Sequence, residues 1–366
     1  MSMGIDRDSK IPLYKQISDI LLEEINTGLY SESNLLPSEK QICERFDVER
    51  NTVRRGLQLL VEQNLIEKKP GFGTIIKTDE SDNIIKASQK SNILFIFQSE
   101  EESDNRLSEL FYTNLFQEFE KKLTNKQFNL LYKTIGTNNS LKDIVKLTNP
   151  AGIIFISNID ESNYKQAIKM NIPVVSINRH SSLLTSIVSD NMHGAYEITK
   201  LMLENGHKKI AIIEGSEGYQ TMQERFMGVK SALHDYGLEL NENFVFKGDW
   251  SFNSGKAAAE KIAKLEDRPT AVFAFNDVMA YGAMQYFEAN GIKIPDDISI
   301  AGFDKINKYD GVFKEITTVD VNIEAFVETA CTNLLTNINS SPVTPVKIYI
   351  PTIIDNHNTI KNIRKE

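Results

Sequence analysis

Apolar residues follow two different patterns along the chain, and the first of them covers its beginning. A stripe over 13–25 repeats every four positions and predicts an amphipathic helix. Ser38 and Gln41 have capping-box spacing, which predicts the start of a second, short helix. A further stripe predicts a helix over about 50–63, and two strand-like runs flank a turn at 70–73. Three helices followed by a hairpin predict a winged helix-turn-helix domain.

The second pattern consists of short apolar runs that alternate with amphipathic stretches. Alternation of this kind predicts parallel sheets that are covered by helices on both faces. About 270 residues suffice for two such lobes, with a ligand-binding cleft where they meet. The strands are expected at 93–97, 128–132, 152–156, 174–177, 210–213, 271–274 and 298–301, and helices at 107–123, 193–205, 220–236, 255–264 and 278–290.

Together these patterns divide the chain into three parts. Residues 1–78 are expected to form the winged helix-turn-helix domain, and residues 92–366 the two-lobed α/β domain. The segment 79–91 is polar apart from Ile84 and Ile85 and shows no periodicity. We therefore expect a flexible linker there.

Charge is distributed unevenly, which changes the interpretation of a net charge of −9. The net charge argues against non-specific binding of nucleic acid by the whole molecule. Residues 49–77, however, carry six Lys and Arg against three Asp and Glu. Positive charge is thus concentrated on the third predicted helix and the hairpin.

The apolar stripe of the third helix faces the core, which leaves a polar face for solvent or for a ligand. Arg50, Asn51, Arg54 and Arg55 lie on that face. Arg pairs bidentately with guanine and Asn with adenine when a recognition helix enters the major groove. Ordinary solvated surface charges remain the alternative for any one of these residues.

Three sequence motifs, at 12–14, 36–39 and 71–74, resemble the DNA-binding domain of the GntR family, without a gap between them. Relatives commonly have Ser or Thr where this chain has Glu49, and we expect Glu49 to cap the third helix through its carboxylate. The resemblance, together with the polar face, predicts these DNA-binding residues: Ser38, Lys40, Arg50, Asn51, Thr52, Arg54, Arg55, Gly71 and Gly73.

The large domain resembles the effector domain of the LacI family, which is similar to periplasmic sugar-binding proteins. The motifs that carry the resemblance lie at 172–179, 188–191, 205–210, 224–228, 248–250, 275–277, 294–300, 302–304 and 317–319. The resemblance implies an effector site made of Tyr112, Asn178, Arg179, Asp190, Thr221, Arg225, Trp250, Asn276 and Asp304. Arg and carboxylates suit vicinal hydroxyls, and an aromatic face suits the C–H side of a sugar ring.

A GntR-type winged helix before a LacI-type effector domain is the arrangement of arabinose repressors. The resemblance therefore implies a repressor that leaves its operator when a pentose binds, with L-arabinose first. A sugar phosphate or a nucleobase as effector, and co-repression in place of induction, stay open. We expect a homodimer that forms through the C-terminal domain and binds two half-sites.

Other function classes lack their motifs. No nucleophile elbow, zinc-protease helix or phosphate loop is found, so we expect neither an enzyme nor a cofactor. The two cysteines, Cys43 and Cys331, lie in different segments and predict no cysteine-based zinc site. The polar N-terminus predicts no secretory signal and the short apolar runs no membrane span, so a cytoplasmic protein is expected.

Overall fold

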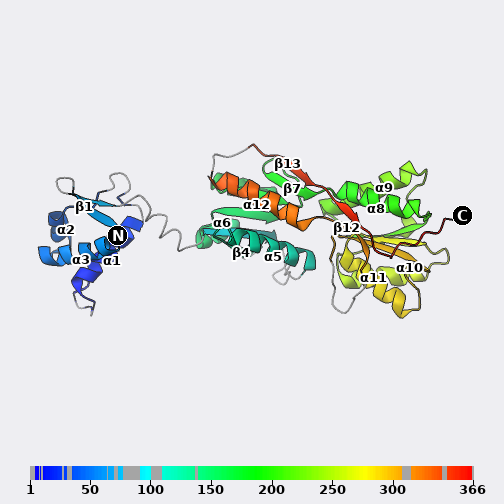
Figure 1. Cartoon of the computed structure of the whole chain (residues 1–366), viewed down its shortest axis with the longest axis horizontal. Coiled ribbons are helices and arrows are strands. Elements are labelled where there is room, and N and C mark those ends of the chain that lie inside the picture. The colour runs from blue at the N-terminus through cyan, green and yellow to red at the C-terminus, as the bar shows by residue number, and fades with distance from the viewer. Residues whose placement is uncertain are drawn as a thin grey trace. The chain divides into compact units, whose positions relative to one another are not determined.

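The computed structural model describes most of the chain as two compact units, residues 1–90 and 91–366 (Figure 1). The described residues are 5–7, 9, 11–26, 29–30, 35–63, 65–69, 73–76, 91–99, 109–136, 139–306, 315–339 and 344–364.

The first unit has the predicted order of three helices and a hairpin. Its elements are α1 (Leu13–Asn26), α2 (Glu39–Phe46), α3 (Arg50–Glu62), β1 (Ile66–Lys69) and β2 (Gly73–Ile76). The two strands pair antiparallel, with Ile66 opposite Ile76. Ile17, Leu21 and Leu57 are completely buried between the helices. A Cβ on Gly56 would lie 2.8 Å from the carbonyl oxygen of Tyr14, so glycine permits the close approach of α1 and α3.

Two capping predictions in this unit have different outcomes. The capping box is confirmed: the hydroxyl of Ser38 accepts from the backbone N–H of Gln41, and the backbone N–H of Ser38 donates to the side chain of Gln41. The prediction for Glu49 is wrong. Glu49 occupies the N-cap position of α3, but its carboxylate makes no cap hydrogen bond. Its two-carbon side chain reaches past the first amides, which the one-carbon side chains of the preferred N-caps meet directly.

The second unit confirms the two-lobed α/β prediction, with one sheet in each lobe. In the described residues, the sheet of the first lobe has the strand order β13-β7-β6-β5-β3-β4 and is parallel throughout. The elements of this lobe are β3 (Ser91–Gln98), α5 (Leu110–Thr124), β4 (Phe128–Ile135), α6 (Leu141–Thr148), β5 (Gly152–Ile156), α7 (Glu161–Lys169), β6 (Val174–Ile177), β7 (Thr185–Ser189), α12 (Ile323–Asn339) and β13 (Lys347–Ile350).

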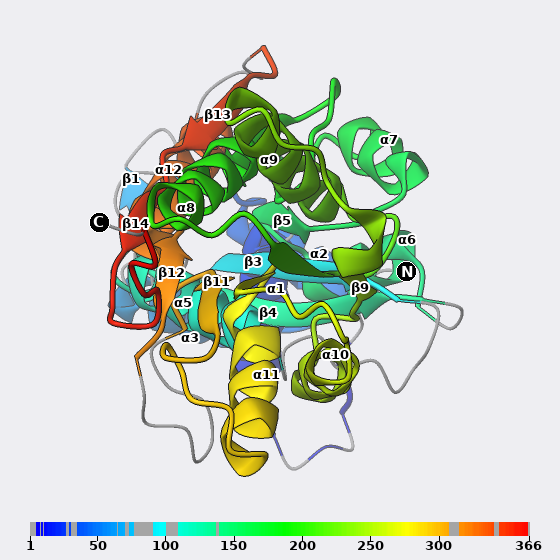
Figure 2. The same cartoon turned by 90° about the vertical axis from the view of Figure 1, so that its right-hand side faces the viewer.

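The sheet of the second lobe has the order β14-β12-β11-β10-β8-β9, and only the β12–β14 pair of its described strands is antiparallel. Helices α8 and α9 cover one face, and α10 and α11 the other (Figure 2). The elements are α8 (Asn191–Glu204), β8 (Ile210–Glu214), α9 (Gln220–Asp235), the 3-10 turn η2 (Glu242–Phe244), β9 (Val245–Lys247), α10 (Phe252–Ala263), β10 (Ala271–Ala274), α11 (Asp277–Ala289), β11 (Ser299–Phe303), β12 (Thr317–Asp320) and β14 (Ile353–Asp355).

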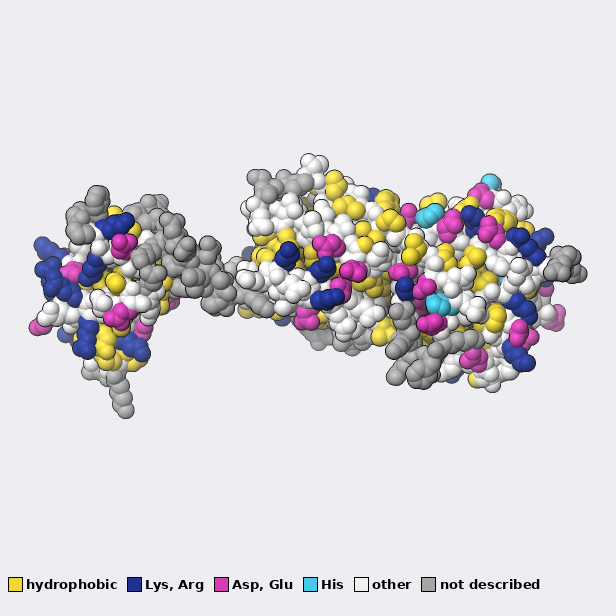
Figure 3. All heavy atoms as spheres, viewed as in Figure 1, with side chains coloured by type: hydrophobic (Ala, Val, Ile, Leu, Met, Phe, Trp, Pro, Cys, Tyr) yellow, Lys and Arg dark blue, Asp and Glu magenta, His cyan; other side chains and the backbone are white. Residues whose placement is uncertain are grey.

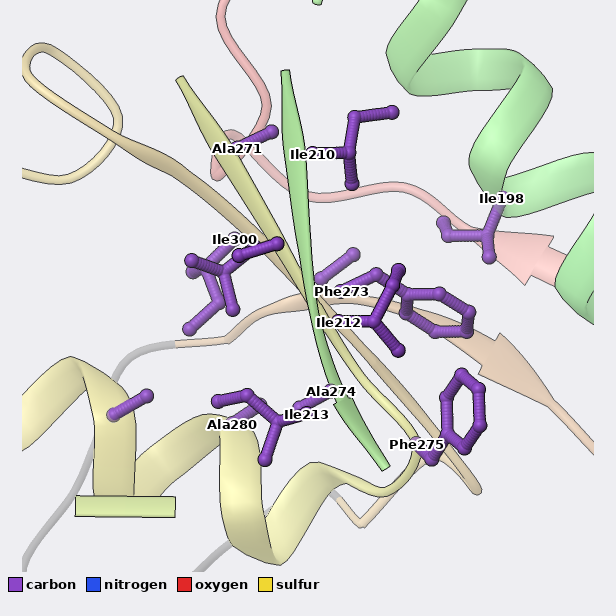
Figure 4. Close-up of a cluster of buried hydrophobic side chains, with 14 of the residues drawn as sticks. Ile198, Ile210, Ile212, Ile213, Ala271, Phe273, Ala274, Phe275, Ala280 and Ile300 are labelled. Carbon is purple, nitrogen blue, oxygen red and sulfur yellow. The ribbon is translucent and has the colours of Figure 1, made fainter. Parts of the chain in front are cut away.

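Central strands are buried on both faces, which explains their continuous apolar runs. Figure 4 shows side chains of β8 and β10 on both sides of the sheet, Ile212 among them, with Ile198 of α8 on one side and Ala280 of α11 on the other. The apolar pattern did not predict β7, β9, β12, β13 and β14. In β7 and β12 the apolar run is interrupted by buried hydroxyls. Thr318, for example, donates to Asp277 at 2.6 Å and thereby satisfies its buried hydroxyl.

The chain passes between the lobes three times. It crosses between β7 and α8 at Asp190, between β12 and α12, and between β13 and β14. The effector site expected between the lobes therefore lies beside the segments about which they can move. No described helix is both long and apolar enough to cross a membrane.

Candidate functional site

The first candidate site is the cationic face of the winged helix. Arg50 and Arg54 of α3 donate through their Nε atoms to Glu39 Oε2 at 2.8 and 3.0 Å, and Lys68 of β1 donates to Glu39 Oε1 at 3.0 Å. Lys and Arg side chains gather over α2 and α3 on the visible side of this unit (Figure 3). One carboxylate at the start of α2 thus holds together cations from a helix and from the wing.

The Glu39 side chain is 17% exposed, whereas Arg50 and Arg54 are 67% and 53% exposed. Burial alone would raise the pKa of Glu39, but hydrogen bonds from Arg50, Lys68 and Arg54 outweigh it and lower the pKa to about 2. Glu39 is therefore ionised at every physiological pH. The cations keep most of their surface in solvent, where a phosphate or a base edge can reach them.

The other residues predicted to bind DNA occupy different surroundings. The hydroxyl of Ser38 is already used as the N-cap of α2, where it accepts from the backbone N–H of Gln41. Arg55 lies over the ring of Tyr14, with 4.6 Å between guanidinium and ring centre. Lys40 and Asn51 are exposed, and Thr52 is half-buried. Gly73 opens β2 with a φ of 99°, a conformation that favours glycine. Gly71 lies outside the described residues.

Substitution Glu39→Gln is expected to destabilise the winged helix, because three cations then face one another without their shared anion. A network of partly exposed pairs contributes about 1 kcal/mol, or roughly 4–8 °C in the melting temperature of a unit this small. Circular dichroism melts of the full chain would measure the loss. The contribution of Glu39 should be present above its ordinary pKa near 4.5 and disappear as the pH falls towards 2. Glu67→Gln, an exposed change on β1, is the matched control, and an equal loss in both variants would refute the shared-anion role.

The second candidate site is a cavity between the two lobes of the second unit. Asn178 and Asp304 directly follow β6 and β11, and Asn276 lies two residues after the end of β10. All three therefore lie at the carboxyl ends of parallel strands. Ligands of open α/β sheets bind at this edge. The cavity is lined by Glu109, Phe111, Tyr112, Asn178, Tyr219, Thr221, Arg225, Trp250, Asn276 and Asp304.

Arg225 and Asp304 form a buried ion pair in this lining. Their side chains are 7% and 8% exposed, and Arg225 Nη2 donates to Asp304 Oδ1 at 3.0 Å. Arg225 also donates to the carbonyl oxygen of Phe275, and its guanidinium lies 3.6 Å from the centre of the Phe303 ring. Burial raises the pKa of Asp304 to about 6, although Arg225 opposes the shift. At neutral pH the two charges therefore compensate each other.

Trp250, the only tryptophan of the chain, forms an aromatic wall of the cavity. A Cβ on Gly215 would lie 2.0 Å from its ring, so the indole packs directly on a glycine. Asn276 donates to the carbonyl oxygen of Trp250 at 2.9 Å and accepts from the backbone of Met279, which fixes this loop to the start of α11. In the described part of the chain, the buried Nε1 of Trp250 has no hydrogen-bond partner.

Two of the predicted effector residues lie outside the cavity lining. Arg179 Nη1 donates to Asn158 at 3.0 Å. Asp190 accepts from the backbone of His193 and so caps α8 at one of the crossings between the lobes. The other seven predicted residues line the cavity, and Tyr112 additionally bonds to Ser157 at 2.7 Å.

Sequence reasoning missed three residues of the lining, Glu109, Phe111 and Tyr219. Phe111 stands next to Tyr112 in an aromatic pair, which was a usable signal. Tyr219 precedes α9, which carries two predicted residues, but no motif includes it. Glu109 belongs to a strand-to-helix turn without any recognisable motif.

Both units match known protein families. The family of bacterial regulatory proteins called gntR matches residues 13–76, and the periplasmic binding protein-like domain matches residues 199–357. These matches fall on the winged helix and on the second unit.

Three similar proteins are transcriptional regulators by name. The chain is 36% identical over 201 residues to the probable HTH-type transcriptional repressor ExuR of Bacillus subtilis, covering 54% of this chain and 60% of the relative. It is 32% identical over 225 residues to the HTH-type transcriptional regulator DegA of the same organism, covering 58% and 66%. It is 38% identical over 139 residues to the HTH-type transcriptional repressor PurR of Vibrio campbellii, covering 38% and 42%. The chain thus spans less than two thirds of each relative.

Solved structures share the fold. The transcriptional regulator CelR in complex with cellobiose has a TM-score of 0.64 at 21% identity, covering 85% of this chain and 91% of that one. A LacI family regulator from Enterococcus faecium with bound ribose has a TM-score of 0.65 at 20% identity, covering 75% and 100%. The chain therefore joins a winged helix-turn-helix domain of the bacterial gntR type to a two-lobed periplasmic binding protein-like domain, whose fold it shares with the LacI family regulator from Enterococcus faecium.

Proposed function

We propose that the chain is a transcriptional repressor that binds operator DNA through its winged helix and is released by a small neutral sugar. The observation that carries the proposal is the buried, charge-compensated Arg225–Asp304 pair in a cavity with aromatic walls. L-Arabinose is the first effector to test. The repressors named among its relatives favour a regulator over an enzyme.

The electrostatics of the cavity favour a neutral ligand. Arg225 is the one cation among the described residues of the lining, and Asp304 compensates its charge. Glu109 adds a second carboxylate to the lining. A phosphate or carboxylate ligand would meet no uncompensated cation there, and burial of an unpaired anion is costly. This argues against the sugar phosphate that the sequence left open.

The polar groups of the cavity suit a polyol. Thr221, Asn178 and Asn276 offer hydroxyl and amide groups, which donate to and accept from sugar hydroxyls. Trp250 and Tyr219, with ring centres 6.0 Å apart, offer aromatic surface for the C–H side of a ring.

A ligand that contacts both lobes favours the arrangement in which they are close. Tyr112 and Asn178 come from the first lobe, and Arg225 and Asp304 from the second. The sugar should lower DNA affinity by the free energy with which it prefers the form that does not bind DNA. We further propose a homodimer that forms through the second unit and places two winged helices on two half-sites.

The test is a thermal-shift and calorimetry screen of the full chain against L-arabinose, other neutral sugars, sugar phosphates and nucleobases. A ligand at 100 times its Kd stabilises the folded state by about 2.7 kcal/mol. We expect a neutral sugar to bind, with D-arabinose as the stereochemical control for an L-arabinose response. Binding of phosphates or bases alone would keep the regulator and refute the neutral sugar. Tighter operator binding with the sugar would show co-repression.

A further inference from the structure

A hydrogen-bonded bridge joins the two lobes beside the effector cavity. His180 follows β6 in the first lobe, and Glu224 lies on α9 in the second. His180 Nε2 lies 2.8 Å from Glu224 Oε1, and the backbone N–H of His180 donates to Gln220 Oε1 at 2.9 Å. Gln220 in turn donates to Glu224 Oε1 at 3.0 Å. Two residues of one helix turn on α9 thus bind the same residue of the opposite lobe.

The second carboxylate oxygen of Glu224 connects this bridge, through hydrogen bonds, to Arg225 of the cavity lining. Asn191 Nδ2 donates to Glu224 Oε2 at 3.1 Å, and Asn191 Oδ1 accepts from Arg225 Nε at 3.0 Å. Asn191 is 1% exposed, and its bond to Arg225 is buried. Asn191 is also the first residue of α8, just after the chain crosses between the lobes. The side-chain amide of Asn191 therefore connects Arg225 to the His180–Glu224 bridge, next to one of the segments that cross between the lobes.

We propose that His180, Glu224 and Asn191 are positioning residues that link closure of the two lobes to the orientation of Arg225. Separation of the lobes breaks the His180–Glu224 contact and leaves Gln220 as the remaining donor to Glu224 Oε1. Glu224 is then held less firmly, and so is the Asn191 amide, which donates to Glu224 and to the carbonyl oxygen of Ser189. The position of the Arg225 Nε becomes less well defined as a result. The importance of Arg225 for the effector rests on the proposed function, whereas the bridge between the lobes does not depend on it.

The surroundings of His180 make this bridge sensitive to pH. Glu224 of α9 contacts the ring through Nε2, and Lys347 and Tyr349 of β13 lie nearby, with the Tyr349 ring centre 5.6 Å away. Glu224 accepts hydrogen bonds only, so neutral His180 carries its proton on Nε2. In the described chain the buried Nδ1 has no hydrogen-bond partner. A second proton would therefore sit in a buried position without an acceptor.

Burial lowers the pKa of His180, Glu224 opposes the shift and Lys347 adds to it. In separated lobes the ring is exposed and regains a pKa near 6.5. Protons therefore bind preferentially to the open form. The contribution of His180 to closure is complete above about pH 6.5. It decreases as the pH falls below that value, because the open form then binds the proton more readily. Each unit of difference between the two pKa values changes the ratio of closed to open molecules by up to about tenfold.

The test uses the full chain without ligand, with Trp250 as the reporter. Since Trp250 is the only tryptophan and lines the cavity, acrylamide quenching of its fluorescence measures access to the cavity. Between pH 7.5 and 5.5 we expect the quenching constant of the unsubstituted protein to rise by about twofold or more. In His180→Gln, whose amide can still donate to Glu224 but does not titrate, this rise should become clearly smaller, and the part that remains should come from Asp304, whose pKa of about 6 lies in the same interval. His234→Gln, a change at a 90% exposed side chain, is the matched control and should keep the rise.

The contribution of Glu224 is tested separately. Glu224→Gln presents an amide that cannot accept from both His180 and Asn191, so its quenching constant at pH 7.5 should exceed that of the unsubstituted protein at the same pH. An unchanged constant in Glu224→Gln would overturn the proposal, as would the same pH dependence in His180→Gln and in the unsubstituted protein. Because no ligand is added, failure of L-arabinose to bind leaves this result intact.

Discussion

Replacement of Arg225 by alanine is expected to abolish sugar binding and to destabilise the second unit by about 3–5 kcal/mol. The substitution leaves Asp304, 8% exposed, as a buried carboxylate without its cation. It also leaves Asn191 and the carbonyl oxygen of Phe275 without their donor. Calorimetric titration with the sugar identified in the screen and thermal unfolding of the full chain would measure both effects.

Arg225→Lys separates binding from stability. Lysine keeps the positive charge beside Asp304, but it cannot serve Asn191, Phe275 and Asp304 together because it lacks the planar fork of donors. We expect a small loss of stability and a large loss of sugar affinity. Operator binding in the absence of sugar should persist, because Arg225 is not in the winged helix. Sugar binding of normal affinity in both variants would refute the assignment of this cavity.

Replacement of Arg54 by alanine is expected to weaken operator binding by about 1–3 kcal/mol while sugar binding is unchanged. Arg54 lies on the exposed face of α3, and Glu39 holds its Nε and thus aims the rest of the guanidinium outward. An operator selected from a random duplex library with the full chain would serve as the probe. Fluorescence anisotropy at several salt concentrations would measure the affinity.

The salt dependence distinguishes two roles for Arg54. If the side chain contacts a phosphate, the slope of log K against log salt should fall by about one and all DNA sequences should be affected alike. If it reads a base, specificity at one operator position should relax. Gln58→Ala, an exposed change on the same helix, is the control and should bind normally. Unchanged operator affinity in Arg54→Ala would show that Arg54 does not contact the operator.

Local signals were sufficient for most elements of the fold. The capping box at Ser38 and Gln41 marks the start of α2 because both partners lie within one helical turn. The buried parallel strands, such as β5, are continuous apolar runs because both of their faces are covered. Strands β7 and β12 escaped this reasoning, since their buried hydroxyls are satisfied by partners far away in the sequence. Thr318 and Asp277, for example, are 41 residues apart.

In the effector cavity too, local sequence signals predicted some features, whereas others depend on residues that are distant in the sequence. Motifs pointed to residues at strand ends, such as Asn276 and Asp304, because strands of a parallel sheet end at one edge. They could not show that Arg179 turns to Asn158 or that Asp190 caps α8. Those choices depend on side-chain rotamers and on neighbours that come from other elements. Glu109 and Tyr219 were missed for the same reason.

The sequence by itself determined a winged helix with a cationic face and a two-lobed α/β domain, because helical spacing, capping residues and apolar runs act over a few residues. Tertiary structure alone decided which charges are paired. It brings Arg225 to Asp304 over 79 positions, His180 to Glu224 over 44 positions, and Lys68 to Glu39 over 29 positions. Pairing across such distances depends on how whole elements pack, and no local pattern encodes it.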